Sequence, residues 1–172
     1  PNSQHEFGRQ AMKAVDEARD GIAKIINCKP SELYFTSGGT ESDNWALRGV
    51  AKAFRSKGNH IIISPIEHAA MLVTAKALEK EGFKVTYLDV YENGIVKVED
   101  VEKAITDETC LVTIMYANNE IGTIQPIAEI GKLCHNKGVL FHTDAVQAVG
   151  HVKIDVKEQN IDMLSLSGHK FH

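Results

Sequence analysis

The sequence predicts an α/β fold, with a mostly parallel β-sheet that has helices on both faces. In some stretches apolar residues recur every three to four positions, as in amphipathic helices, and in others they form short β-type runs. The two kinds of segment alternate along the chain, which indicates βαβ units and therefore parallel strands. Polar and glycine-rich clusters follow the strand-like runs, at the edge where an open parallel sheet binds its ligands.

The first half of the chain opens with a helix. Apolar positions from Ala11 to Ile25 repeat at helical spacing, and Pro30 marks the end of this helix. A glycine-rich turn then separates a short strand from the next helix. The elements predicted after the first helix are strand Leu33–Thr36, a helix through Trp45 to Gly58, strand His60–Ser64, helix Ala69–Lys80 and strand Lys84–Leu88.

The second half continues the alternation. Its predicted elements are helix Val98–Ile105, strand Leu111–Met115, helix Ile127–Asn136, strand Val139–His142 and strand Ile161–Leu166. Gly138 lies just beyond one of these helices, where glycine commonly ends a helix. No linker, low-complexity segment or internal repeat interrupts the series, so residues 1–172 are expected to form one domain or most of one.

The composition favours a soluble domain that handles small molecules. Of 172 residues, 43% are hydrophobic and 24% charged, which allows an ordinary core. A formal net charge of -4 gives no basic field, so nucleic acid and anionic membrane are not expected partners. No apolar stretch approaches the roughly 20 residues that span a bilayer. Cys28, Cys110 and Cys134 lie far apart, which favours a reducing compartment, and the last two are expected to be buried.

Five polar or glycine-rich clusters follow predicted strands. They are Ser37–Asn44, Pro65–His68, Asn118–Glu120, Thr143–Gln147 and Ser167–Lys170. Because the carboxyl ends of parallel strands meet at one edge of a sheet, these clusters are expected to form a single site.

The first cluster is a candidate phosphate site. Gly38, Gly39 and Thr40 enter a predicted helix, whose free N–H groups and dipole favour an anion. The alternative is an ordinary helix start, in which Thr40 is the N-cap and Asp43 is an acidic residue of the first turn. Neither the Walker lysine nor a G-x-G-x-x-G motif is present, so the pattern disfavours nucleotide binding.

The last two clusters contain the reactive candidates. Lys170 follows an apolar strand in a Ser, Gly and His setting, where a lysine can form a Schiff base. Asp144 follows the apolar run Val139–Phe141, so it should be poorly solvated and needs a partner such as a protonated pyridine nitrogen. Alternatively, Asp144 is the N-cap of a following helix. Gln147 could donate to a ring oxygen or could be an ordinary surface residue.

The remaining clusters leave alternatives open. His68 could stack on a flat ring or transfer a proton near neutral pH, although a lone loop histidine is more often a surface residue. Asn118 and Asn119 suit either a tight turn or polar ligand contacts. The chain has eight histidines, but no three or four ligands occur at a recognised metal-binding spacing, so no metal is expected.

Together these features match what pyridoxal 5'-phosphate requires: a phosphate cup, an acidic partner for the ring nitrogen, a stacking histidine and a Schiff-base lysine. The motif series resembles the cysteine desulfurases, the NifS/IscS-like members of the class V aminotransferase group of fold-type I pyridoxal phosphate enzymes. The matching segments are Pro1–Ser3, Phe7–Gly8, Thr36–Asn44, Glu67–His68, Asn118–Gly122, His142–Gln147 and Ser167–Phe171. His172 stands where many relatives have tyrosine.

The resemblance implies a role for each candidate residue. Lys170 would form the internal aldimine and move protons at the substrate α-carbon. Asp144 would keep the ring nitrogen protonated, and His68 would stack on the ring and assist proton transfer. The other implied cofactor contacts are Gln147 at the ring hydroxyl oxygen, Asn119 at the cofactor or substrate, and Gly39, Thr40, Ser167 and His169 at the phosphate.

The resemblance also implies a domain and an activity. Residues 1–172 would be the large pyridoxal phosphate-binding domain, truncated at both ends and lacking the C-terminal small domain. The parent enzyme would convert L-cysteine to L-alanine and form an enzyme persulfide for iron–sulfur cluster assembly. A sulfur acceptor or scaffold protein and a second subunit are the implied partners. A cytoplasmic location is expected, with an organelle as the alternative.

Two alternatives remain because the family's nucleophilic cysteine and carboxylate-binding arginine lie beyond residue 172. None of Cys28, Cys110 and Cys134 is at a matching position. The enzyme could therefore be a selenocysteine lyase or another class V pyridoxal phosphate enzyme. As a free polypeptide, the 172-residue chain could be a non-catalytic fragment.

Overall fold

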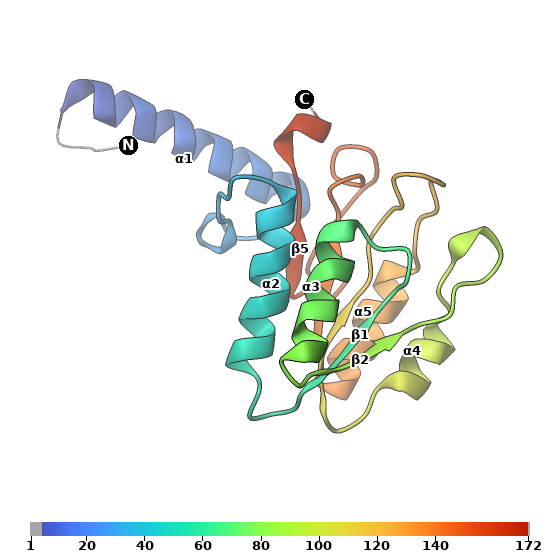
Figure 1. Cartoon of the computed structure of the whole chain (residues 1–172). Coiled ribbons are helices and arrows are strands. Elements are labelled where there is room, and N and C mark those ends of the chain that lie inside the picture. Colours follow the sequence, from blue (N-terminus) through green and yellow to red (C-terminus); the bar gives the residue numbers. More distant parts are fainter. Residues whose placement is uncertain (1–4, 172) are drawn as a thin grey trace.

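A computed structural model describes residues 5–171 of the chain. The segment Pro1–Ser3 and His172, which entered the resemblance, lie outside the described residues. Within the described part, the expected α/β architecture is confirmed: one sheet lies between two layers of helices (Figure 1).

The sheet has five strands, and all neighbouring strands are parallel. The strands are β1 (His60–Ile63), β2 (Lys84–Tyr87), β3 (Thr109–Thr113), β4 (Leu140–Asp144) and β5 (Met163–Ser165). Their order is β2-β1-β3-β4-β5, so the chain leaves β1 toward one edge and returns to pair β3 on its other side. Such a reversal opens a crevice at the carboxyl edge of the sheet, between the loops that follow β1 and β3.

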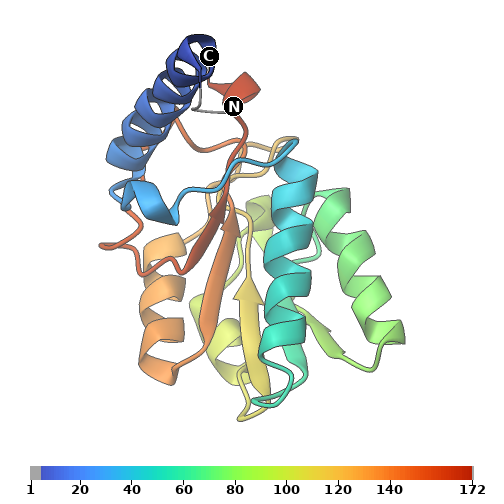
Figure 2. The same ribbon diagram turned by 90° about the vertical axis from the view of Figure 1, so that its left-hand side faces the viewer.

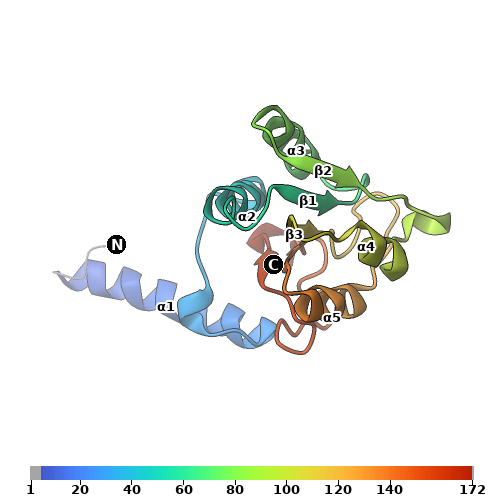
Figure 3. The same ribbon diagram turned by 90° about the horizontal axis from the view of Figure 1, so that it is seen from below.

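Helices cover both faces of the sheet. They are α1 (Glu6–Ile26), α2 (Gly39–Ala53), α3 (Ala69–Lys80), α4 (Val98–Ala104) and α5 (Ile127–Lys137). Figures 2 and 3 show α2 and α3 on one face and α4 and α5 on the other. The long helix α1 extends away from the body of the fold, and its C-terminal residues Ala23 and Ile26 are buried (Figure 1).

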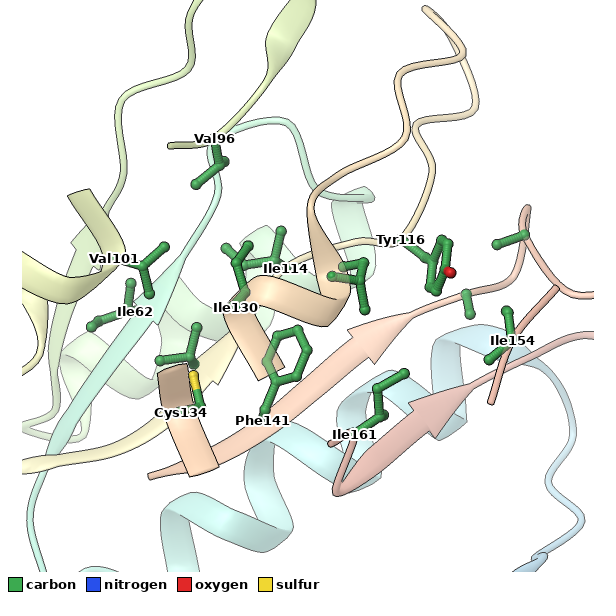
Figure 4. Close-up of a cluster of buried hydrophobic side chains, with 14 of the residues drawn as sticks. Ile62, Val96, Val101, Ile114, Tyr116, Ile130, Cys134, Phe141, Ile154 and Ile161 are labelled. Atoms are coloured by element: carbon green, nitrogen blue, oxygen red, sulfur yellow. The ribbon is translucent and has the colours of Figure 1, made fainter. Parts of the chain in front are cut away.

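The two faces have separate hydrophobic cores because a parallel sheet between two helix layers buries both of its sides. On one side Leu47, Ile61 and Met71 are fully buried. On the other side, Ile130 and Cys134 of α5 lie against Phe141 of β4 (Figure 4). The expectation that Cys110 and Cys134 are buried is confirmed, and both are free thiols.

One predicted strand is wrong. Residues 33–36 form no strand; the chain there is a connection from the short 3-10 helix Pro30–Glu32 to α2. Leu33 is buried, but Tyr34 and Phe35 are 69% and 51% exposed, whereas a central strand of the sheet would be buried on both faces. The Leu33 carbonyl instead accepts a hydrogen bond from Arg19 of α1.

Candidate active site

A cavity of about 300 Å³ lies at the carboxyl edge of the sheet. All nine residues predicted for the cofactor site line it, from the loops after β1, β3, β4 and β5 and from the start of α2. They are Gly39, Thr40, His68, Asn119, Asp144, Gln147, Ser167, His169 and Lys170. Asp43, Met115, Ala117 and Val146 complete its lining and were not predicted.

The start of α2 gives the cavity an anion-binding end. Gly39 and Thr40 are the first two residues of this helix, so their N–H groups have no partner within the helix. A Cβ atom at Gly39 would lie 2.9 Å from Cγ2 of Val146, so glycine permits this close packing. The alternative that Thr40 caps the helix is wrong, because Gly38 occupies the N-cap position and provides no side chain.

Ser167, His169 and Lys170 lie together on the short segment that follows β5. The Ser167 Oγ and His169 Nδ1 atoms are 2.8 Å apart. A 3-10 turn over Gly168–Lys170, closed by the Lys170 N–H bond to the Ser167 carbonyl, places the half-buried lysine in the cavity lining. A hydroxyl and an imidazole are thus close to a primary amine.

Asp144 ends β4 and is 6% exposed. Its Oδ1 accepts a 2.9 Å hydrogen bond from the Val146 N–H, which fixes the turn after the strand. No helix begins at Ala145, so the helix-cap alternative for Asp144 is wrong, although the side chain does stabilise a turn. Burial raises the pKa of Asp144, while the Val146 bond and His68 oppose that effect.

His68 occupies the N-cap of α3. Its Nδ1 accepts a 3.1 Å hydrogen bond from the Ala70 N–H, so a neutral ring carries its proton on Nε2. The imidazole is therefore oriented by the helix start. His68 is exposed, as expected of a surface histidine, and it also lines the cavity.

The two adjacent asparagines have different positions. Asn118 is buried, donates to the Ile66 carbonyl and accepts from the Glu120 and Ile121 N–H groups, so it fixes the turn. Asn119 is exposed and lines the cavity. Gln147 is half-buried and lines the cavity from the turn after Asp144.

Two buried carboxyl groups were missed as site features. Asp43 and Glu67 are 2% and 6% exposed, and each has one oxygen without a hydrogen-bond partner among the described residues. Burial, before any other cause, raises the pKa of Asp43 to about 7 and that of Glu67 to about 8. The spacing of Asp43 with Leu47 and Val50 was the available signal, since it puts the acid on the buried face of α2.

Metal sites and membrane-spanning helices can also be checked within the described residues. Within residues 5–171, no group of three His, Cys, Asp or Glu side chains is arranged to hold a metal ion. None of the helices in that range is long and apolar enough to cross a membrane.

The whole chain, residues 1–172, matches the family described as aminotransferase class-V. It is 61% identical over 172 residues to cysteine desulfurase IscS of Clostridium botulinum (strain Kyoto / Type A2), covering all of this chain and 43% of that protein. It is 56% identical over 171 residues to cysteine desulfurase IscS of Methanosarcina thermophila, covering 99% of this chain and 42% of that protein. The chain thus spans less than half the length of these curated relatives.

Solved structures show the same similarity. A NifS-like protein superimposes with a TM-score of 0.95 at 45% identity, covering all of this chain and 48% of that one. SspA in complex with cysteine gives a TM-score of 0.93 at 44% identity, covering 98% of this chain and 49% of that one. With the family match over its full length, the chain belongs to the aminotransferase class-V family.

Proposed function

We propose that this chain is the pyridoxal phosphate-binding large domain of a cysteine desulfurase, which converts L-cysteine to L-alanine and leaves the sulfur as an enzyme persulfide. The observation that carries the proposal is the convergence of Lys170, Asp144 and the start of α2 on one cavity. Pyridoxal phosphate is a general cofactor of the family, and several relatives are named cysteine desulfurase.

The cavity fits the three chemical parts of this cofactor. The free N–H groups of α2, with Ser167 and His169, suit a phosphate dianion. The poorly solvated carboxylate of Asp144 suits a protonated ring nitrogen, because the two carry single charges of opposite sign. The amine of Lys170 suits the carbonyl carbon, and Gln147 and Asn119 offer amide groups to the ring hydroxyl and the substrate.

When bound, the cofactor would supply an electron sink for the bonds at the substrate α-carbon. The protein's own residues would bind, orient and move protons around it. Asp144 would hold a proton on the ring nitrogen, and the buried setting makes this charge pairing strong. Lys170 would hold the cofactor and carry a proton to and from the α-carbon. The oriented Nε2–H of His68 would assist proton transfer.

L-cysteine is the proposed substrate. One similar solved structure is that of SspA in complex with cysteine, and the relatives with up to 61% identity are named cysteine desulfurases. None of Cys28, Cys110 and Cys134 lines the cavity as the structure describes it, so the persulfide cysteine is proposed to lie outside this chain. A sulfur acceptor or iron–sulfur scaffold protein, a homodimer and a cytoplasmic location remain predictions.

The test is a product assay on the protein at its full natural length, loaded with pyridoxal phosphate. It should release alanine from L-cysteine and carry a persulfide, and Lys170→Ala should abolish both. Release of alanine from L-selenocysteine alone would instead identify a selenocysteine lyase. No alanine from either substrate would refute the proposal. If the full-length protein is active and the 172-residue chain is not, the chain alone is a non-catalytic fragment.

A further inference from the structure

Asp43 is a buried carboxyl group with an unusual place in the cavity. It lies four residues after Gly39 on α2, so it shares a helix face with the anion-binding end. The residue is 2% exposed, its Oδ1 has no hydrogen-bond partner among the described residues, and it still lines the cavity. Native proteins rarely leave a buried polar atom unsatisfied, so this group needs an explanation.

The elements packed against Asp43 offer it no cationic partner. From β4, Nε2 of His142 lies 4.0 Å from Asp43 Oδ1, but burial lowers the pKa of His142 to about 4, so the ring is neutral near pH 7. That Nε2 is also 3.1 Å from the Ser165 hydroxyl, which in turn contacts Ser42. Among the described residues, Asp43 forms no ion pair with lysine or arginine.

The groups coupled electrostatically to Asp43 are acidic. The charge of Asp144, at the end of β4, raises the pKa of Asp43, and Asp43 in turn raises the pKa of Glu67 in the loop after β1. His68, His169 and Lys170 line the same cavity, but burial and the charge of Asp144 dominate and raise the pKa of Asp43 to about 7. The Ser165 hydroxyl opposes that rise. Ionising two buried carboxyl groups in one cavity costs free energy, because each negative charge raises the pKa of the other, so one of them keeps a proton.

We propose that Asp43 is a positioning residue that keeps its proton over the pH range in which Asp144, in the same cavity, ionises, so that Asp144 carries the single negative charge at the ring end of the cavity. This inference rests on the proposed function for the ring cation that Asp144 would pair with, but not for the protonation of Asp43. The single negative charge of Asp144 would balance the single positive charge of the protonated ring nitrogen. A second ionised carboxyl would leave an unpaired charge in the same buried space.

The proposal predicts a coupled titration in the cofactor-free protein. The two carboxyl groups should lose their protons in two steps that belong to the pair. Asp144 should respond to both steps, because ionisation of Asp43 changes the field at its carboxyl. A purely structural Asp43 would leave the titration of Asp144 unaffected.

The experiment follows side-chain carboxyl carbons by NMR in the cofactor-free protein of full natural length, with carbon-13-labelled aspartate. In the unmodified protein, the Asp43 carbon should titrate near pH 7, and the Asp144 carbon should show a second step at the same pH. The second step should disappear in Asp43→Asn, which keeps the side-chain shape. It should persist in Asp107→Asn, the matched control, because Asp107 is exposed in the loop before β3, at the edge of the sheet opposite the cavity.

Two results would overturn the proposal. One is an Asp43 carbon in the unmodified protein that titrates in the ordinary range of aspartate, which needs no variant to fold. The other is an Asp144 curve that is the same with and without Asp43→Asn. Because no cofactor is present, failure of the proposed enzymatic function would leave this measurement unchanged.

Discussion

The buried histidines within the sheet and the buried carboxyl groups at its carboxyl edge differ in how completely they are hydrogen-bonded. His60, which begins β1 at the opposite edge, has Nδ1 2.7 Å from the Thr109 hydroxyl and Nε2 2.9 Å from that of Thr86. Both ring nitrogens of His142 are paired as well. Asp43 and Glu67, by contrast, each leave an oxygen unpaired among the described residues.

This difference in hydrogen bonding distinguishes buried polar groups with a structural role from those with a functional one. Fully paired buried groups stabilise a fold and have no capacity left for a ligand. Unpaired groups cost free energy, and they are retained where a ligand or a proton is needed. Among the described residues, the unpaired Asp43 lines the cavity with the nine predicted site residues, and the unpaired Glu67 directly precedes His68, whereas the paired histidines lie on the strands.

The largest expected effect concerns Asp144. Asp144→Asn keeps an acceptor for the Val146 N–H but removes the charge, so turnover should fall about 10²–10³-fold, more than cofactor affinity falls. Steady-state rates and cofactor binding in the full-length protein measure the two effects. Asp144→Ala also removes the acceptor and should be at least as impaired. An unchanged rate in both variants would mean that Asp144 only fixes the turn.

The second prediction uses the paired histidine His142 and acidic pH. Burial lowers its pKa from 6.5 to about 4, so the unfolded state takes up a proton first as the pH falls. Stability is therefore unaffected above about pH 6.5 and falls by about 3 kcal/mol as the pH drops toward 4. Urea unfolding at several pH values should show that the free energy of unfolding depends less on pH in His142→Gln than in the unmodified protein. Equal pH dependence in the two proteins would mean that His142 does not cause the loss of stability in acid.

The third prediction concerns His60. His60→Ala leaves the Thr86 and Thr109 hydroxyls without their ring partners, so the free energy of unfolding should fall by about 1–3 kcal/mol. Cofactor affinity should not change, because His60 is at the opposite edge of the sheet from the cavity. His135→Ala, on the exposed side of α5, is the control and should change stability little. Lost cofactor affinity in His60→Ala would break the distinction between the two regions.

The smallest expected effect is at Gly39. Gly39→Ala brings a methyl group to within 2.9 Å of Val146 Cγ2, so cofactor affinity should fall about tenfold. Adding Val146→Ala should restore most of the affinity, because it removes the crowded atom. Gly49→Ala in the same helix meets only an ordinary contact with Trp45 and should have no effect. If the double variant does not regain cofactor affinity, crowding against Val146 is not the cause of the loss.

Much of the fold follows from periodicity alone. Helix α3 spans Ala69–Lys80, as predicted, because its apolar positions and the Gly82 stop are both local signals. Residues 33–36 were mistaken for a strand because a β-type run of residues looks the same whether or not a neighbouring strand is present to pair with it.

The candidate site was predictable to the extent that it lies at strand ends. Seven of the nine residues meet because the carboxyl ends of parallel strands and the loops after them share one edge, whereas Gly39 and Thr40 begin α2 and follow no strand. The residue types alone could not separate the structural Asn118 from the cavity-lining Asn119, which only the family resemblance singled out, since that depends on which side chain closes the turn. Asp43 was taken for a first-turn acid because its burial depends on packing against β4 and β5.

Lys170 is proposed to hold pyridoxal phosphate in the cavity at the carboxyl edge of the sheet. Borohydride reduction of the cofactor-loaded, full-length protein, followed by peptide mass spectrometry, identifies the lysine that binds the cofactor. A single stable adduct is expected on the peptide that contains Lys170, and it should be lost in Lys170→Ala. An adduct on another lysine, or no adduct at all, would contradict it.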